Sequence, residues 1–280
     1  MLACPPETKQ NRGMDNLRLC RSLLFLPASN PRAIEKARGL AADMVVLDLE
    51  DAVKPDDKDR AREAAVAAVD GPFQGLVAIR INSRAPWHEA DLAAVSKSAV
   101  PWLVYPMTSS PDDIRRVSDR TGKPVLAMVE TAKGVINAAA IAGEAAALIA
   151  GTNDLSADLG LRPGHARTAL ATALQSILLA ARAAGIAAFD GVYNRLDDPE
   201  GLEAECGEGR AFGFDGKSLI HPNQIEAANR LFGPSDAEVE AARRLIATAT
   251  GGAERYEGEM IERMHVEQAR FVLARARQSA

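Results

Sequence analysis

The sequence predicts an α/β protein, a (β/α)8 TIM barrel followed by a C-terminal helical extension. From Cys20 onward, a short apolar run, a turn and a helix-like segment follow one another eight times, and this alternation is typical of parallel βαβ units. The chain has 280 residues, enough for one such barrel of ~250 residues. No G-x-G-x-x-G motif follows any of these strands, which favours a closed barrel over an open, doubly wound sheet.

Each predicted strand is a short apolar run that ends at polar or turn residues. The eight runs are 21–28, 45–51, 76–82, 100–107, 124–130, 147–154, 187–193 and 214–220. The helices predicted after them are 31–40, 55–69, 86–96, 111–121, 131–143, 165–184, 199–211 and 222–232, with a short turn over 155–159 before the sixth. Asn30 followed by Pro31, and Ser110 followed by Pro111, are typical helix starts, and Gly122 is a typical stop.

Three segments are expected along the chain. Residues 1–16 lack any periodicity and are predicted to be a disordered lead-in. Residues 17–234 form the barrel, and 235–280 form the helical extension. Ser235 and Glu238 make a capping box at the start of its first helix, and a final helix is predicted over 261–277. The extension exceeds what eight βα units need, so we expect it to pack on the barrel, on a neighbouring subunit, or on both.

Composition excludes several classes of function. The net charge of −5 offers no general attraction to nucleic acid or to an anionic membrane. The three cysteines include no close pair, which argues against a disulfide framework and a cysteine zinc site, and fits a reducing cytoplasm. No export signal is recognised, and the apolar stretch 169–188 contains Gln175 and Arg182, which favours an amphipathic helix over a membrane span.

Three carboxylates, those of Asp48, Glu50 and Asp51, stand at the end of the second predicted strand. Like charges this close raise one another's pKa unless a metal or an arginine compensates them. Acids also end strands as helix caps or solvated loop residues, but three directly after an apolar run favour a functional site.

In a barrel, catalytic groups lie at the C-terminal ends of the strands. Glu130 and Asp154 are 24 residues apart and therefore belong to neighbouring strands. Two carboxylates at a barrel mouth suit Mg²⁺, which keeps water or substrate in its other positions. An acid such as Glu130 at a helix start also interacts favourably with the helix dipole, and this alternative stays open. Arg80, on an inward strand face, is costly to bury unless it meets an anion.

With these residues assembled, the chain resembles the citrate lyase β-subunit branch of the HpcH/HpaI aldolase superfamily from residue 21 to about residue 246. The segments that carry the resemblance are RSLLFLPA (21–28), VVLDLEDAV (45–53), IRIN (79–82), VETAKGV (129–135), GTNDLSADLG (151–160), DGVY (190–193) and GFDGKSLIHPNQI (213–225).

The resemblance implies a cytoplasmic, Mg²⁺-dependent lyase that cleaves or forms the C–C bond of a 3-hydroxyacyl thioester such as citryl-, malyl- or citramalyl-CoA. It implies Glu130 and Asp154 as metal ligands, Glu130 also binding substrate, and Arg80 as the substrate-binding electrophile. It implies that Asp48 and Glu50 support metal-bound water, with Asp51 beside them around the site. A homo-oligomer, a trimer in the family, and an acyl-CoA substrate are implied partners.

Several positions depart from the family pattern. Asp51 stands where the 2-oxoacid aldolases carry a histidine, Met107 where a lysine is common, and Asn153 where a glutamate is usual. The stretch 260–262 aligns with a segment whose aspartate acts as base in a neighbour's active site in related CoA lyases, so Glu262 is the corresponding candidate. Thioester hydrolysis, or a non-catalytic subunit that binds an acyl-carrier partner, remain alternative functions, and the acyl group is left open.

Overall fold

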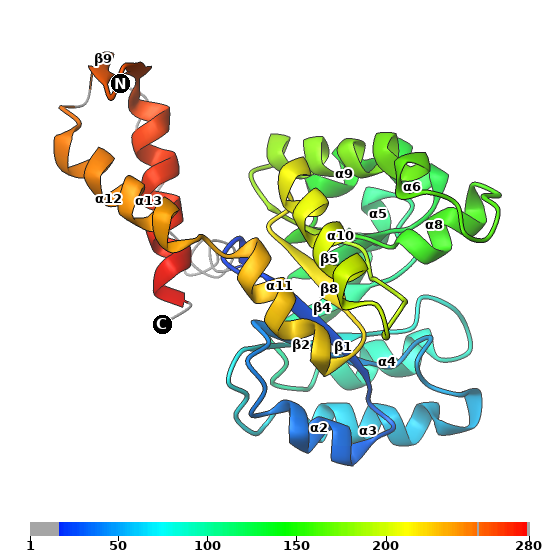
Figure 1. Ribbon diagram of the computed structural model, residues 1–280. Helices are drawn as coiled ribbons and strands as arrows, with labels where there is room; N and C mark the ends of the chain where they lie inside the picture. The colour runs from blue at the N-terminus through cyan, green and yellow to red at the C-terminus, as the bar shows by residue number, and fades with distance from the viewer. Residues whose placement is uncertain (1–16, 251, 279–280) are drawn as a thin grey trace.

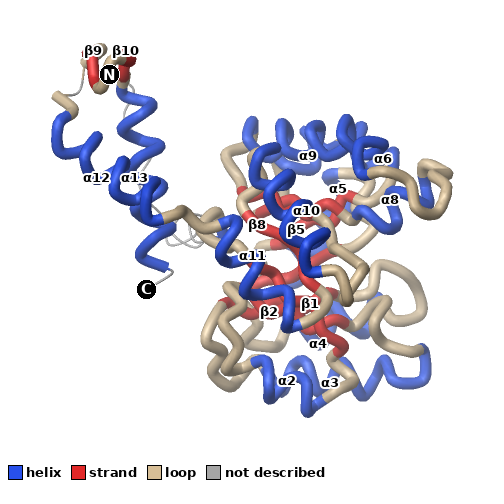
Figure 2. Tube along the Cα trace, in the orientation of Figure 1, coloured by secondary structure: helices blue, strands red, loops and turns tan. Residues whose placement is uncertain are grey.

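The computed structural model describes residues 17–250 and 252–278. Eight parallel strands close into a barrel in the order β1 to β8, each hydrogen-bonded to its neighbours in sequence and β8 to β1. The strands are β1 (Ser22–Pro27), β2 (Met44–Asp48), β3 (Leu76–Arg80), β4 (Trp102–Tyr105), β5 (Val125–Val129), β6 (Ala147–Ala150), β7 (Ala187–Asp190) and β8 (Gly216–Leu219). The predicted (β/α)8 barrel is therefore confirmed, with strands at the centre and helices outside (Figure 2).

The helices surround the barrel and connect successive strands (Figure 1). They are α2 (Pro31–Ala37), α3 (Lys58–Ala68), α4 (His88–Val95), α5 (Pro111–Thr121), α6 (Ala132–Ile136), α7 (Ala138–Ala142), α8 (Thr152–Asp158), α9 (Ala171–Ala183), α10 (Pro199–Phe212) and α11 (Ile225–Phe232). Short 3₁₀ turns precede three of them: η1 (Pro55–Asp57), η2 (Arg167–Leu170) and η3 (Pro222–Gln224).

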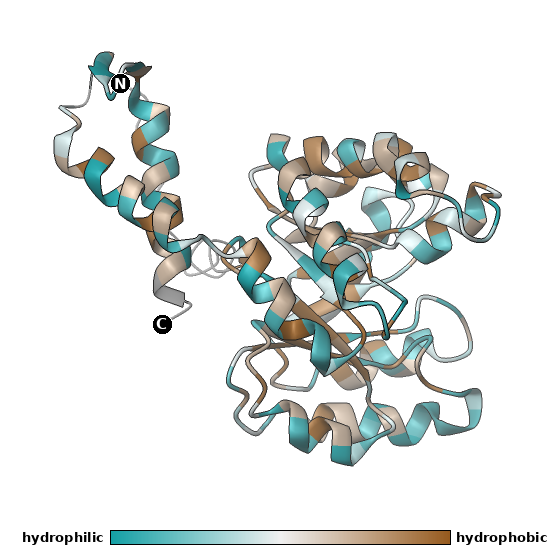
Figure 3. Cartoon of the chain, viewed as in Figure 1, coloured by the Kyte–Doolittle hydropathy of each residue, from teal (hydrophilic) through white to brown (hydrophobic). Residues whose placement is uncertain are grey.

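Alternation along the strands produces two apolar clusters. Side chains such as Val46, Val104 and Phe189 fill the inside of the barrel, whereas Leu47, Leu103 and the helix residues around them form the layer between strands and helices. Figure 3 shows the strands as mainly apolar and the outer helices as mixed. At the C-terminal ends of the strands the inward-facing side chains change from apolar to polar, as at Asp48, Arg80 and Glu130. The candidate active site lies at this end of the barrel.

Most predicted boundaries are close to those observed, and the differences have local causes. Ser110 and Asp113 form a capping box for α5, and Gly122 ends that helix with a left-handed φ of 68°. The prediction of a sixth strand through residue 154 was wrong, because β6 ends at Ala150 and α8 begins at Thr152. The predicted turn over 155–159 is therefore part of a helix, and the helix predicted over 131–143 is divided at Asn137.

The extension contains α12 (Asp236–Thr248), a hairpin of β9 (Glu254–Tyr256) and β10 (Glu259–Ile261), and α13 (Arg263–Gln278). The hairpin was not predicted, whereas the capping box of Ser235 and Glu238 is present. α12 and α13 pack against each other and project away from the barrel (Figure 1). The lead-in predicted for residues 1–16 lies outside the described residues.

The extension is attached at the end of the barrel where the strands begin. The guanidinium of Arg275 donates from Nη2 to the carbonyl oxygens of Asp215 at 2.6 Å and Phe232 at 3.0 Å, and from Nη1 to that of Arg18 at 3.1 Å. Arg18 and Asp215 precede β1 and β8. The extension therefore leaves from the end opposite the C-terminal strand ends. None of the described helices is long and apolar enough to cross a membrane.

Candidate active site

A cavity of about 340 Å³ lies at the C-terminal ends of the strands. Its walls come from most of the barrel, from β1 through the loops after β7 and β8. The lining residues include Phe25, Asp48, Asp51, Arg80, Met128, Glu130, Gly151, Asn153 and Asp154. The structure thus brings Asp48, Asp51, Arg80, Glu130 and Asp154 to one cavity, as the sequence predicted.

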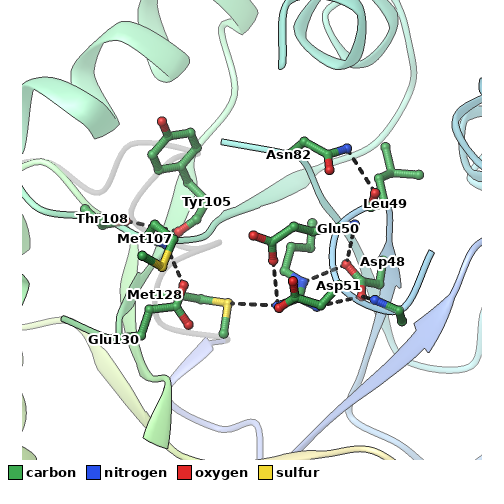
Figure 4. Close-up of polar contacts among 12 residues, drawn as sticks. Asp48, Leu49, Glu50, Asp51, Asn82, Tyr105, Met107, Thr108, Met128 and Glu130 are labelled. Atoms are coloured by element: carbon green, nitrogen blue, oxygen red, sulfur yellow. Dashed lines mark hydrogen bonds and ion pairs between the residues drawn. The ribbon is translucent and has the colours of Figure 1, made fainter. Parts of the chain in front are cut away.

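Arg80 lies on the inward face of β3, directly beside Asp48 of β2 in the strand register. Its guanidinium donates from Nε and Nη2 to the two carboxylate oxygens of Asp48, both at 2.6 Å. Figure 4 shows Asp48 together with Glu50 and Asp51. Nη1 lies 2.9 Å from Oε2 of Glu50. Burial alone would lower the pKa of Arg80, but the charges of Asp48 and Glu50 outweigh burial and raise it. Arg80 therefore stays charged and fixed in direction, with further N–H donors to offer a ligand.

The turn after β2 is organised by the carboxylate of Asp48. Its oxygens accept hydrogen bonds from the backbone N–H groups of Glu50 at 2.8 Å and Ala52 at 3.0 Å. Glu50 is largely buried, and burial raises its pKa to about 8, against the opposing effect of Arg80. Asp51, in contrast, is 69% exposed at the cavity rim. The acidic run thus supplies one carboxylate to hold Arg80, one buried acid beside it and one carboxylate facing solvent.

Glu130 follows β5 and is only 2% exposed. Its Oε1 accepts a hydrogen bond of 2.5 Å from the backbone N–H of Met107 (Figure 4), and Met107 has a φ of 53°, uncommon for a non-glycine residue. Burial raises the pKa of Glu130 to about 7, the negative charge of Asp154 adds to this effect, and the hydrogen bond from Met107 opposes it. A buried carboxylate held in this way is suited to bind a cation.

Gly151 leaves the space that Glu130 occupies. A Cβ at this position would lie 2.2 Å from Oε2 and 2.4 Å from Cβ of Glu130. Only glycine therefore allows Glu130 its observed position.

Asp154 lies in the first turn of α8. The sequence had placed it at the end of the sixth strand, and that prediction was wrong. Burial raises its pKa, and the negative charge of Asp51 raises it further. The side-chain amides of the neighbouring Asn153 and of Asn194 donate hydrogen bonds to each other, the shorter at 2.7 Å. This pair connects α8 to the loop after β7 at the opening of the cavity. An amide here, in place of an acid, leaves Asp154 with one fewer negative neighbour.

The donor set fits a hard divalent cation. Asp48 and Glu50 are compensated by Arg80, whereas no ion pair reaches Glu130 or Asp154 from the residues that the structure describes. No cluster of three or more acidic, histidine or cysteine ligands occurs among those residues. Two carboxylates are therefore the available protein ligands, which suits Mg²⁺ because this ion usually keeps several waters or substrate oxygens.

Glu262 does not line this cavity. It is exposed in the extension at the start of α13, where its backbone N–H donates to Nδ1 of His265 at 2.9 Å. The extension is attached at the opposite end of the barrel, so the structure separates Glu262 from the cavity of its own chain (Figure 1).

Sequence reasoning did not single out Gly151, Lys58 or Met128 as site residues. Gly151 carried the best available signal, because a glycine directly after a buried strand often marks a close approach of another group. Lys58 lies within a charged helix start and Met128 within an apolar strand, where neither stands out.

This chain is similar to known proteins over most of its length. Residues 21–222 match the family model described as HpcH/HpaI aldolase/citrate lyase. A (3S)-malyl-CoA thioesterase of Cereibacter sphaeroides is 44% identical over 91% of this chain and 94% of its own length. The citrate lyase subunit beta of Leuconostoc mesenteroides is 34% identical over 93% of this chain and 94% of its own length.

A solved structure shows the same fold and, by its description, carries ligands. The protein CitE of Mycobacterium tuberculosis, in complex with magnesium, acetoacetate and coenzyme A, superposes with a TM-score of 0.78. It is 33% identical, and the match covers 93% of this chain and 99% of that one.

Proposed function

Because this chain belongs to the HpcH/HpaI aldolase/citrate lyase family, we propose that it is a Mg²⁺-dependent enzyme acting on a 3-hydroxyacyl-CoA thioester of the malyl-, citramalyl- or citryl-CoA type. The observation that carries the proposal is the single cavity that unites Glu130, Asp154 and Arg80. Magnesium in complexes of the Mycobacterium tuberculosis relative supports the choice of metal.

Each of the three side chains has a distinct task in this proposal. Glu130 and Asp154 would hold the metal, which would supply Lewis-acid polarisation of the substrate's oxygen atoms. Arg80, kept charged by Asp48, lies where negative charge develops on the thioester oxygen and stabilises it. Met107 and Gly151 keep the Glu130 carboxylate in the required position.

Hydrolysis is the outcome we propose first. The relatives at 44% identity over most of the chain are named as (3S)-malyl-CoA thioesterases. In this reaction, water forms a C–O bond with the thioester carbon, the C–S bond breaks, and the CoA thiol leaves with a proton. Arg80 stabilises the oxyanion formed on the way.

Carbon–carbon cleavage is a second candidate, supported by the similarity to citrate lyase β subunits. Here the 3-hydroxyl loses its proton, the C2–C3 bond breaks, and the electron pair passes to the thioester as an enolate that Arg80 stabilises. The α-carbon must then gain a proton, which gives acyl-CoA and an oxoacid. A binding subunit without activity would not need Glu130 and Asp154, and both are present.

The donor of that proton is proposed to be Glu262 of a neighbouring copy. Glu262 is exposed and lies between β10 and α13, in the extension that projects from the barrel (Figure 1). In this proposal Glu262 acts in the cavity of a neighbouring subunit, which requires a homo-oligomer.

Product analysis tests the proposal. Purified protein with malyl-CoA and Mg²⁺ should release malate and free CoA if it hydrolyses, or glyoxylate and acetyl-CoA if it cleaves. EDTA should abolish either reaction, and the Glu130→Gln and Asp154→Asn variants should lack it. No turnover of malyl-, citramalyl- or citryl-CoA with Mg²⁺ would contradict the proposal.

A further inference from the structure

Lys58 is a buried lysine beside the active site whose hydrogen-bonding capacity is fully used. Its side chain, at the start of α3, is 6% exposed. Nζ donates to the carbonyl oxygens of Leu49 and Glu50 and to Oδ1 of Asn82, each at 2.7 Å. An ammonium group has three N–H donors and no acceptor. Lys58 therefore has no proton left to give a substrate hydrogen bond.

The two carbonyls that Lys58 holds belong to the peptide groups on either side of the Glu50 Cα. Fixing both peptide planes restricts the backbone of Glu50 and so the direction in which its side chain leaves. That side chain reaches Nη1 of Arg80 at 2.9 Å. From the other side, the Asp48 carboxylate holds the N–H groups of Glu50 and Ala52. The acidic turn is thus fixed by a cation on one side and an anion on the other.

The third acceptor of Lys58 is itself rigidly held. Asn82 donates from Nδ2 to Oδ2 of Asp91 at 2.6 Å and to the carbonyl of Leu49 at 2.9 Å (Figure 4 shows the second contact). Asp91 is fully buried in α4 and accepts a hydrogen bond of 2.6 Å from Nε of Arg62 in α3. Helices α3 and α4 are therefore joined through Lys58 to the turn that carries the acidic cluster.

We infer that Lys58 is a positioning residue of the active site, which orients Glu50 and, through it, the guanidinium of Arg80. The inference rests on the proposed function, because Arg80 matters only if charge develops on a ligand oxygen. Arg80 stabilises charge that develops in the transition state, whereas Glu130 and Asp154 contribute to binding of the substrate in its ground state through the metal. Loss of Lys58 should therefore lower kcat more than it raises KM.

Two variants test the inference. Lys58→Met keeps the length of the side chain and removes the ammonium; we expect kcat to fall about 10- to 100-fold with KM changed less than about threefold, as for a supporting residue around a site. Lys58 lines a second cavity of about 260 Å³ together with Trp87 and Asn82. Lys58→Ala removes the side chain and leaves a space that is open to this cavity. Added methylammonium or ethylammonium should enter it and restore part of kcat, whereas the neutral alcohols of equal size should not.

A matched control is available on the same segment. Lys54 is exposed and its side chain makes no capping hydrogen bond at the start of η1, so Lys54→Met should leave kcat and KM unchanged. The inference is overturned if Lys58→Met turns over like wild type, or if both Lys58 variants lose activity only in parallel with Tm and amines restore nothing.

Failure of the proposed function can be told apart from failure of this inference. If the wild type turns over no CoA thioester, the proposed function fails, and a crystal structure of Lys58→Met then decides the positioning role by itself. A Glu50 carboxylate withdrawn from Arg80 in that structure supports the role, and an unchanged distance between them overturns it.

Discussion

Replacing Gly151 by alanine should impair metal binding by displacing the carboxylate of Glu130. The added Cβ would lie 2.2 Å from Oε2 of Glu130, and ordinary contact begins at 3.4 Å, so the carboxylate must retreat by about 1 Å. Misplacement of a catalytic group by ~1 Å costs up to ~100-fold in rate, and disturbing the support of a metal ligand costs ~10- to 100-fold in affinity. We therefore expect Gly151→Ala to weaken Mg²⁺ binding by at least about tenfold.

Isothermal titration with Mg²⁺, together with thioester turnover at saturating Mg²⁺, measures this effect. Gly207→Ala is the matched control, because nothing lies within 4 Å of an added Cβ at Gly207 in α10. It should keep wild-type Mg²⁺ affinity and turnover and raise stability by about 0.5–1 kcal/mol. Wild-type Mg²⁺ affinity in a folded Gly151→Ala protein would refute the assignment of Glu130 as a ligand that Gly151 accommodates.

Three other changes have outcomes that follow from the structure. Arg80→Met leaves Asp48 buried without its partner, so urea unfolding should show a loss of about 3–5 kcal/mol, and turnover should fall by at least about 100-fold. The pKa of Glu238 is lowered from 4.5 to about 2, mainly by the hydrogen bond that its carboxylate accepts from Arg210. The ionised carboxylate therefore stabilises the fold above its ordinary pKa, and this stabilisation is lost as the pH falls through about 2. The Tm difference between wild type and Glu238→Gln should be constant near neutral pH and vanish in acid, and a Tm difference that persists in acid would contradict this assignment. Burial raises the pKa of Cys206 to about 11, so iodoacetamide at mildly alkaline pH should label this thiol, located by peptide mass spectrometry, only after denaturation.

The barrel could be predicted because its signals are local and repeated. Each short apolar run followed by a helix start predicts one βα unit, and eight such units suffice to indicate the closed topology. The helix limits at Ser110, Gly122 and Ser235 were found because capping residues act through their own backbone neighbours. The inward position of Arg80 followed from strand alternation alone.

The parts that could not be predicted depend on contacts distant in sequence. Nothing local shows that Asp48 of β2 pairs with Arg80 of β3, since this requires the register of two strands. Asp154 was assigned to a strand end because an apolar run precedes it, although the chain turns at Gly151. The β9–β10 hairpin is short and polar, with Glu257 and Gly258 at positive φ in its turn, and gives no periodic signal.

We propose that one divalent cation binds between Glu130 and Asp154, opposite Arg80. Crystals soaked in Mn²⁺, a substitute for Mg²⁺ with a usable anomalous signal, test it directly. We predict one strong anomalous peak about 2.1 Å from a carboxylate oxygen of each acid, absent from crystals of Glu130→Gln. A peak at other residues, or no peak at a Mn²⁺ concentration that supports turnover, would contradict the account.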